Sequence, residues 1–109
     1  MRDFEKDVKS VEWFANSVML RKLAANLDKK HWDEVGIEYL LSRSSDEVEE
    51  LLHELDIIRE NPTNETAIHA AIFECGDVAN FFMMIANKLR KMLDVKPSFT
   101  MVNNEKGEE

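Results

Sequence analysis

Two short acidic motifs contain the residues best suited to chemistry in this chain. Glu47 and Glu50 lie three residues apart in one segment, and Glu74 and Asp77 have the same spacing in the next. In an α-helix this spacing places both carboxylates of a pair on one face. Two such helices packed together would aim four carboxylates at one point, where like charges repel unless they are spread into water or hold a cation. The pattern therefore poses a choice between a solvated acidic surface and a divalent-cation site.

The second motif favours a cation more strongly than the first. Asp46 and Glu49 make the first motif acidic on all sides, as on an ordinary solvated helix face. The second motif lies in the most apolar segment of the chain, with no Lys or Arg within one helical turn, and carboxylates are rarely buried without a partner. All-oxygen ligation suits Mg²⁺ or Mn²⁺. The other source of positive charge is a structural ion pair, for which the candidate cations are Lys22, Lys29, Arg43 and Lys88.

Three long segments with apolar residues at helical spacing must position these motifs. They run over residues 3–28, 33–59 and 64–94, and they predict an all-α fold of long antiparallel helices. Pro62 separates the last two segments, and Thr63 or Asn64 can cap the third. Ser44 and Glu47 have the spacing of a capping box, which would allow a break near residues 43–45. A continuous second helix is the simpler alternative, and we prefer it.

The third segment is apolar over much of its circumference, which predicts that it is the central helix. Gly76 within it would let another helix approach closely. Cys75, the sole cysteine, is expected to be a small buried hydrophobe rather than a reactive thiol. In a monomer of three such helices the third would keep one apolar stripe uncovered, so we expect a homodimer or homotetramer.

Composition limits the classes of function. The chain has 109 residues, enough for one domain, and a net charge of −8, which argues against nucleic acid or an anionic membrane as partner. Nowhere do 18 apolar residues run together, and the first residues lack the apolar core of a signal peptide. One cysteine fits a reducing compartment. These features predict a soluble, cytoplasmic protein.

The strings Asp46-Glu47-Val48-Glu49-Glu50-Leu51 and Glu74-Cys75-Gly76-Asp77-Val78-Ala79-Asn80-Phe81 resemble the two signatures of the MazG-like, all-α nucleoside triphosphate pyrophosphatases. The short MazG-like proteins of phages are the most similar in form. The resemblance spans about residues 10–93, and it implies a MazG-like helical domain over residues 1–96 and a flexible acidic tail over 97–109. His31 departs from it, since a glycine often precedes the tryptophan there.

The resemblance implies a Mg²⁺-dependent hydrolase. It would cleave a (deoxy)nucleoside triphosphate between the α and β phosphates, giving a monophosphate and pyrophosphate. The implied metal ligands are Glu47, Glu50, Glu74 and Asp77, and Glu50 would also orient or deprotonate the attacking water. The implied substrate-binding residues are Lys22, Asn26, Lys29, Trp32, Asn80 and Lys88.

Several of these roles have simpler alternatives. Lys88 could be a solvated lysine near a helix C-terminus, and Trp32 could be a core residue. The whole chain could be a non-catalytic helical protein-interaction module that retains the same fold. No pattern in the sequence selects a base.

Overall fold

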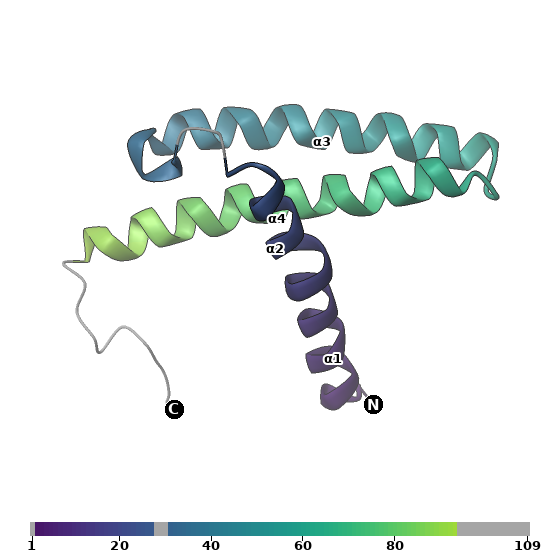
Figure 1. Ribbon diagram of the computed structural model, residues 1–109, viewed down its shortest axis with the longest axis horizontal. Coiled ribbons are helices and arrows are strands. Elements are labelled where there is room, and N and C mark those ends of the chain that lie inside the picture. Colours follow the sequence, from purple (N-terminus) through teal and green to yellow (C-terminus); the bar gives the residue numbers. More distant parts are fainter. Residues whose placement is uncertain (1, 28–30, 94–109) are drawn as a thin grey trace.

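The computed structural model describes residues 2–27 and 31–93, and these residues contain helices and no strand (Figure 1). The all-α prediction is therefore confirmed. The elements are the α-helices α1 (Phe4–Phe14), α2 (Leu20–Ala25), α3 (Ile37–Glu60) and α4 (Glu65–Met92), the π-helical turn η1 (Ala15–Met19) and the 3₁₀ turn η2 (Trp32–Glu34). The expected tail over 97–109 and the expected ends of the first and third segments, at residues 28 and 94, lie outside the described residues.

Helices α3 and α4 form a long antiparallel hairpin (Figure 1). The connection ends at Asn64, whose side-chain oxygen accepts a hydrogen bond of 3.1 Å from the Ala67 N–H and so caps α4. Helix α3 runs without a break through residues 43–45, as preferred from the sequence. The Ser44 hydroxyl donates to the Leu41 carbonyl (2.7 Å) instead of capping a helix. The predicted start at residue 33 was too early, because η2 and Gly36 precede the helix.

The elements α1, η1 and α2 follow one another in a single rod, here called the N-terminal arm, which crosses the hairpin steeply (Figure 1). The arm contacts α4 at Gly76. A Cβ atom at this position would lie 2.5 Å from Val18 Cγ1, which is closer than real Cβ contacts. The predicted role of Gly76 in close helix approach is thus confirmed. Val18 is almost fully buried there.

The hydrophobic core is small. The buried apolar residues of the described chain are Val18, Leu40, Ala67 and Ala71. Large apolar side chains instead form exposed stripes at helical spacing along α1 and α3. The α1 stripe consists of Phe4, Val8 and Val11, and the α3 stripe of Leu41, Val48, Leu52 and Leu55.

Cys75 is exposed in this chain, so the prediction of a buried cysteine was wrong. Its position in an apolar segment suggested burial, but burial depends on which other helix covers that face. The arm covers α4 at the neighbouring Gly76 and leaves Cys75 exposed.

Among the described helices, α4 is long and apolar enough to cross a membrane by length and composition. The core helix of a soluble protein passes the same test, so this property is weak evidence for a membrane span.

Candidate metal centre

The hairpin brings three carboxylates from the two motifs together. One oxygen of each of Glu47, Glu50 and Glu74 lies within 4.8 Å of the others. Glu47 is buried in the face of α3 that also contains the buried Leu40 and Ser44, at helical spacing. Since this face packs against α4, a carboxylate from each helix reaches the same point. We call these three residues the glutamate cluster.

Burial and neighbouring charge strongly perturb Glu74. Desolvation, followed by hydrogen bonding and charge repulsion from Glu47 and then Glu50, raises the pKa of Glu74 from its ordinary 4.5 to about 8. At neutral pH Glu74 therefore holds a proton in the metal-free protein. Its Oε1 atom is buried and has no hydrogen-bond donor among the described residues, so any bond to Glu47 depends on that proton. A buried, unpartnered oxygen beside two other carboxylates fits a cation with oxygen ligands.

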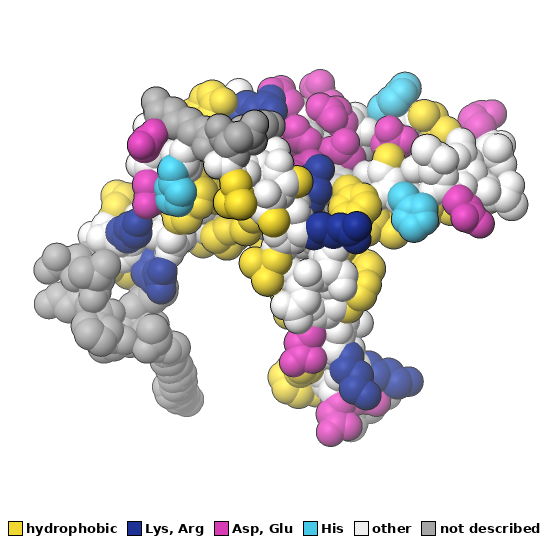
Figure 2. All heavy atoms as spheres, in the orientation of Figure 1, with side chains coloured by type: hydrophobic (Ala, Val, Ile, Leu, Met, Phe, Trp, Pro, Cys, Tyr) yellow, Lys and Arg dark blue, Asp and Glu magenta, His cyan; other side chains and the backbone are white. Residues whose placement is uncertain are grey.

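Arg43 precedes Glu47 by four residues in α3 and supplies a positive charge next to the glutamate cluster. Its guanidinium forms ion pairs with Asp46 (2.8 Å) and with Glu47 (3.5 Å). A shallow hollow of about 530 Å³ is lined by Arg43, Asp46, Glu49, Glu50, His53 and Glu54. Glu50 thus faces both the cluster and an open space. Figure 2 shows acidic side chains gathered over the middle of α3.

Asp77, the fourth predicted ligand, is not part of the glutamate cluster. Its Oδ2 atom forms an ion pair of 3.2 Å with Lys22 Nζ on the N-terminal arm. The sequence left open a divalent-cation site or a structural ion pair, and the structure contains features of both. Three carboxylates converge as metal ligands would, and one of these, Glu47, also pairs with Arg43. Asp77 lies outside the convergence and pairs with Lys22.

Asn26 and Asn80, both predicted to bind substrate, make contacts within the protein. The Asn26 side-chain amide donates to the Lys22 carbonyl (2.9 Å) at the end of α2. Asn80 is buried, and its amide donates to the Met19 carbonyl of η1 (3.0 Å), while its Oδ1 atom has no donor among the described residues. Asn80 therefore joins α4 to the arm.

Lys88 and Trp32 lie toward the other end of the hairpin. Lys88 follows Glu74 by fourteen residues, which is about 21 Å along an α-helix. Its Nζ atom donates to the Asp33 carbonyl (3.3 Å), and Lys91 pairs with the Asp33 carboxylate (3.2 Å). The Lys91 ammonium also lies 5.6 Å from the centre of the Trp32 ring. The structure does not bring these two predicted residues to the cluster.

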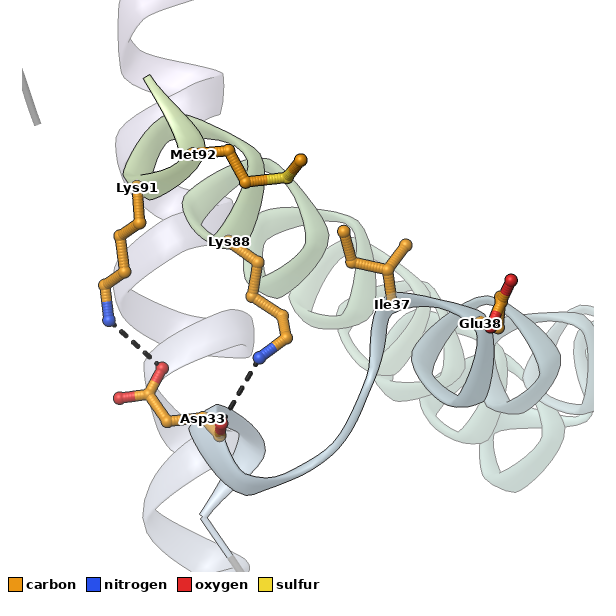
Figure 3. A pocket seen from close by; sticks show the side chains of 6 residues that line it. All are labelled: Asp33, Ile37, Glu38, Lys88, Lys91 and Met92. Carbon is orange, nitrogen blue, oxygen red and sulfur yellow. Dashed lines mark hydrogen bonds and ion pairs between the residues drawn. The ribbon is translucent and has the colours of Figure 1, made fainter. Parts of the chain in front are cut away.

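These contacts border a second hollow, of about 730 Å³, lined by Asp33, Ile37, Glu38, Lys88, Lys91 and Met92 (Figure 3). Asp33 was missed as an anchor for the C-terminal end of α4. Lysines three residues apart, at 88 and 91, were the available sequence signal for it. Lys29, the remaining predicted residue, lies outside the described residues.

Comparison with protein-family models, with curated proteins and with solved structures gives no match. The case for a function therefore rests on the site geometry and on the two motifs.

Proposed function

We propose that this protein is a Mg²⁺-dependent pyrophosphohydrolase of nucleoside triphosphates, with a MazG-like fold and Mn²⁺ as an alternative metal. The observation that supports the proposal is the convergence of the glutamate cluster. Two motifs on the antiparallel helices α3 and α4 supply oxygens within 4.8 Å of one another, and Glu74 Oε1 is buried without a hydrogen-bond partner among the described residues. A solvated acidic surface would not bury Glu74 against Glu47.

Each residue of the cluster has a distinct task in this proposal. Glu47 and Glu74 are the more buried and would hold the metal in a fixed position. Glu50 is exposed, lines the open hollow, and would orient or deprotonate the attacking water while also contacting the metal. A bound divalent cation supplies neutralisation of phosphate oxygens and a lower pKa of bound water. Asp77 would be a fourth ligand after leaving Lys22.

The proposed enzyme is a homodimer or homotetramer that acts on the cytoplasmic nucleotide pool. The exposed stripes on α1 and α3 support assembly, because a stable monomer rarely leaves so many large apolar side chains in water. An assembly that also covers α4 would account for the length and apolar composition of this helix in a soluble protein. The net charge of −8 supports a free nucleotide as substrate rather than nucleic acid.

The proposal is tested with a panel of ribo- and deoxyribonucleoside triphosphates in Mg²⁺ or Mn²⁺, scored for monophosphate and pyrophosphate. We expect equal amounts of the two products from at least one nucleotide, and loss of turnover in Glu50→Gln and Glu74→Gln. Glu60→Gln, the same change at the exposed end of α3, is the matched control and should retain activity. The absence of turnover on every nucleotide, or full activity of both cluster variants, would contradict the proposal.

The exposed α1 stripe favours a second candidate, a non-catalytic protein-interaction module. Such a module should be indifferent to metal and nucleotide. Thermal unfolding discriminates the two, since a ligand that binds the folded state alone raises the melting temperature. The enzyme hypothesis predicts stabilisation by Mg²⁺ and further stabilisation by Mg²⁺ with a nonhydrolysable triphosphate analogue.

A further inference from the structure

Lys22 and Asp77 form their ion pair directly beside the glutamate cluster. Their side chains are 29% and 19% exposed, so the pair is partly shielded from water. It exists because Gly76, next to Asp77, has no side chain to keep the arm away. A Cβ atom at Gly76 would lie 3.5 Å from Lys22 Cγ as well as against Val18.

Asp77 is also within reach of the cluster. It follows Glu74 by three residues in α4, and side chains at this spacing start about 5–6 Å apart on one face of a helix. Rotation of its side-chain torsions can carry the carboxylate from the arm toward Glu74. A carboxylate in this position can serve either of two cations.

We propose that Asp77 exchanges Lys22 for the divalent cation, so that Lys22 is a competing counter-ion that weakens metal binding. This inference rests on the proposed function, since it requires that the glutamate cluster holds a metal. Linkage makes the competition reciprocal: metal binding weakens the attachment of Lys22 to Asp77 by the same factor. The released Lys22 ammonium then lies beside the metal centre, where it can donate a hydrogen bond to a phosphate oxygen of a polyphosphate. Metal and anionic substrate then bind cooperatively.

A double-mutant cycle on metal affinity tests the exchange. The full chain is stripped of metal, and Mn²⁺ binding is measured by electron paramagnetic resonance for wild type, Lys22→Met, Asp77→Asn and the double variant. Lys22→Met should bind Mn²⁺ about two- to fivefold more tightly, as expected from loss of one partly exposed ion pair. Asp77→Asn should bind more weakly, and the gain from Lys22→Met should vanish in the double variant.

The cycle separates exchange from simple charge removal. If the double variant keeps the gain, Lys22 acts on the metal only through its charge, and the exchange is wrong. Unchanged or weaker binding by a folded Lys22→Met variant also overturns it. Wild-type protein that takes up no Mn²⁺ contradicts the proposed function itself, whereas tight uptake with no effect of Lys22 contradicts the exchange alone.

A second measurement needs no variant. Reductive methylation of wild-type lysines, followed by mass spectrometry, reports the freedom of each ammonium. Saturating Mg²⁺ should speed the labelling of Lys22 and leave exposed Lys9 on α1 unchanged. Equal labelling of Lys22 with and without Mg²⁺ would contradict its release.

Discussion

Glu74 is the residue of the glutamate cluster whose surroundings are least favourable to a charged carboxylate. Its helix is the most apolar in the chain, its Oε1 atom is buried, and Glu47 and Glu50 approach it from α3. A proton or a metal ion can relieve the resulting repulsion. The two compete for the same oxygens, so metal affinity and protonation are linked.

The pH dependence of stability should show the proton on Glu74. Its pKa is about 8 in the folded protein against an ordinary value of 4.5, so between these pH values the folded state holds a proton that the unfolded state lacks. Raising the pH through this interval therefore lowers the free energy of unfolding, and above about pH 8 the contribution is lost. Urea unfolding of metal-free protein across this range should show the decline in wild type and not in Glu74→Gln. Glu49→Gln, the same change on the exposed face of α3, should keep the decline; a flat wild-type profile would refute the raised pKa.

Glu47→Gln should weaken metal binding without unfolding the chain. The amide keeps the shape of the side chain but removes a charged ligand, and Arg43 retains its 2.8 Å pair with Asp46. We expect at least about a tenfold loss of Mg²⁺ affinity by calorimetry, since even changes to residues around metal ligands cost that much. Circular dichroism should show wild-type helicity. An unfolded variant would mean that Glu47 is structural.

At the scale of elements, the N-terminal arm and the hairpin meet through small side chains and a few polar contacts. Val18 sits over Gly76, Asn80 bonds the Met19 carbonyl, and Lys22 reaches Asp77. The stripe of α1 continues at the same spacing of four and three residues to Val18 and Lys22, and the main contacts of the arm with α4 come from η1 and α2. The arm is therefore anchored at one end.

Gly76→Ala should loosen this anchor. The new methyl group would lie 2.5 Å from Val18 Cγ1, on a short β-branched side chain that cannot swing aside. Overpacking typically costs about 1–3 kcal/mol, and the better helix propensity of alanine returns about 1 kcal/mol. The difference is a net loss of up to about 2 kcal/mol in urea unfolding, and the 2.5 Å contact leads us to expect a value toward the upper end.

Two variants control the Gly76→Ala experiment. Adding Val18→Ala should offset part of the loss by removing the clashing atom. Gly36→Ala, where no atom lies within 4 Å of the new Cβ, should cost only about 0.5 kcal/mol because alanine caps a helix less well than glycine. A Gly76→Ala protein as stable as wild type would show that the arm is not held against α4 at this point.

At the scale of the whole molecule, the placement of the leucines supports the proposed assembly. The face of α3 that packs on α4 includes Ser44 and Glu47, whereas Leu41, Leu52 and Leu55 lie in the exposed stripe beside it. An isolated chain would therefore bury polar residues between its helices and expose these leucines to water. The proposed assembly would cover the leucines.

Sedimentation equilibrium should therefore give a mass two or four times the 12.7 kDa of the chain. The double variant Val11→Glu/Leu52→Glu, which puts a charge into each stripe, should shift the protein toward the monomer. Ser10→Glu/Ser42→Glu adds the same two charges on exposed positions outside the stripes and should not. A well-folded wild-type monomer at micromolar concentration would contradict the assembly.

The sequence predicted the helices well because apolar spacing is a local property. Capping chemistry predicted a cap at Thr63 or Asn64, of which the structure uses Asn64, and the missing side chain of Gly76 predicted close helix approach there. The partner of Asp77 could not be chosen among four candidate cations, because an ion pair between helices depends on how the arm crosses the hairpin. The exposure of Cys75 depends on the same tertiary arrangement. The distance of Lys88 from Glu74 does not, because both residues lie in α4 and fourteen residues of helix separate them by about 21 Å.

The π-helical turn η1 has a consequence for how the arm is aimed. Its first residues, 15–17, lie between the exposed stripe of α1 and the anchor residues Val18, Met19 and Lys22. One residue added to or removed from a helix rotates everything beyond it by about 100°. A one-residue deletion at residues 15–17 would leave the anchor in place and turn Phe4, Val8 and Val11 toward a different direction in space. The number of residues in η1 therefore sets the direction in which the α1 stripe faces. A related chain with one residue more or fewer there would present this stripe to a different neighbour.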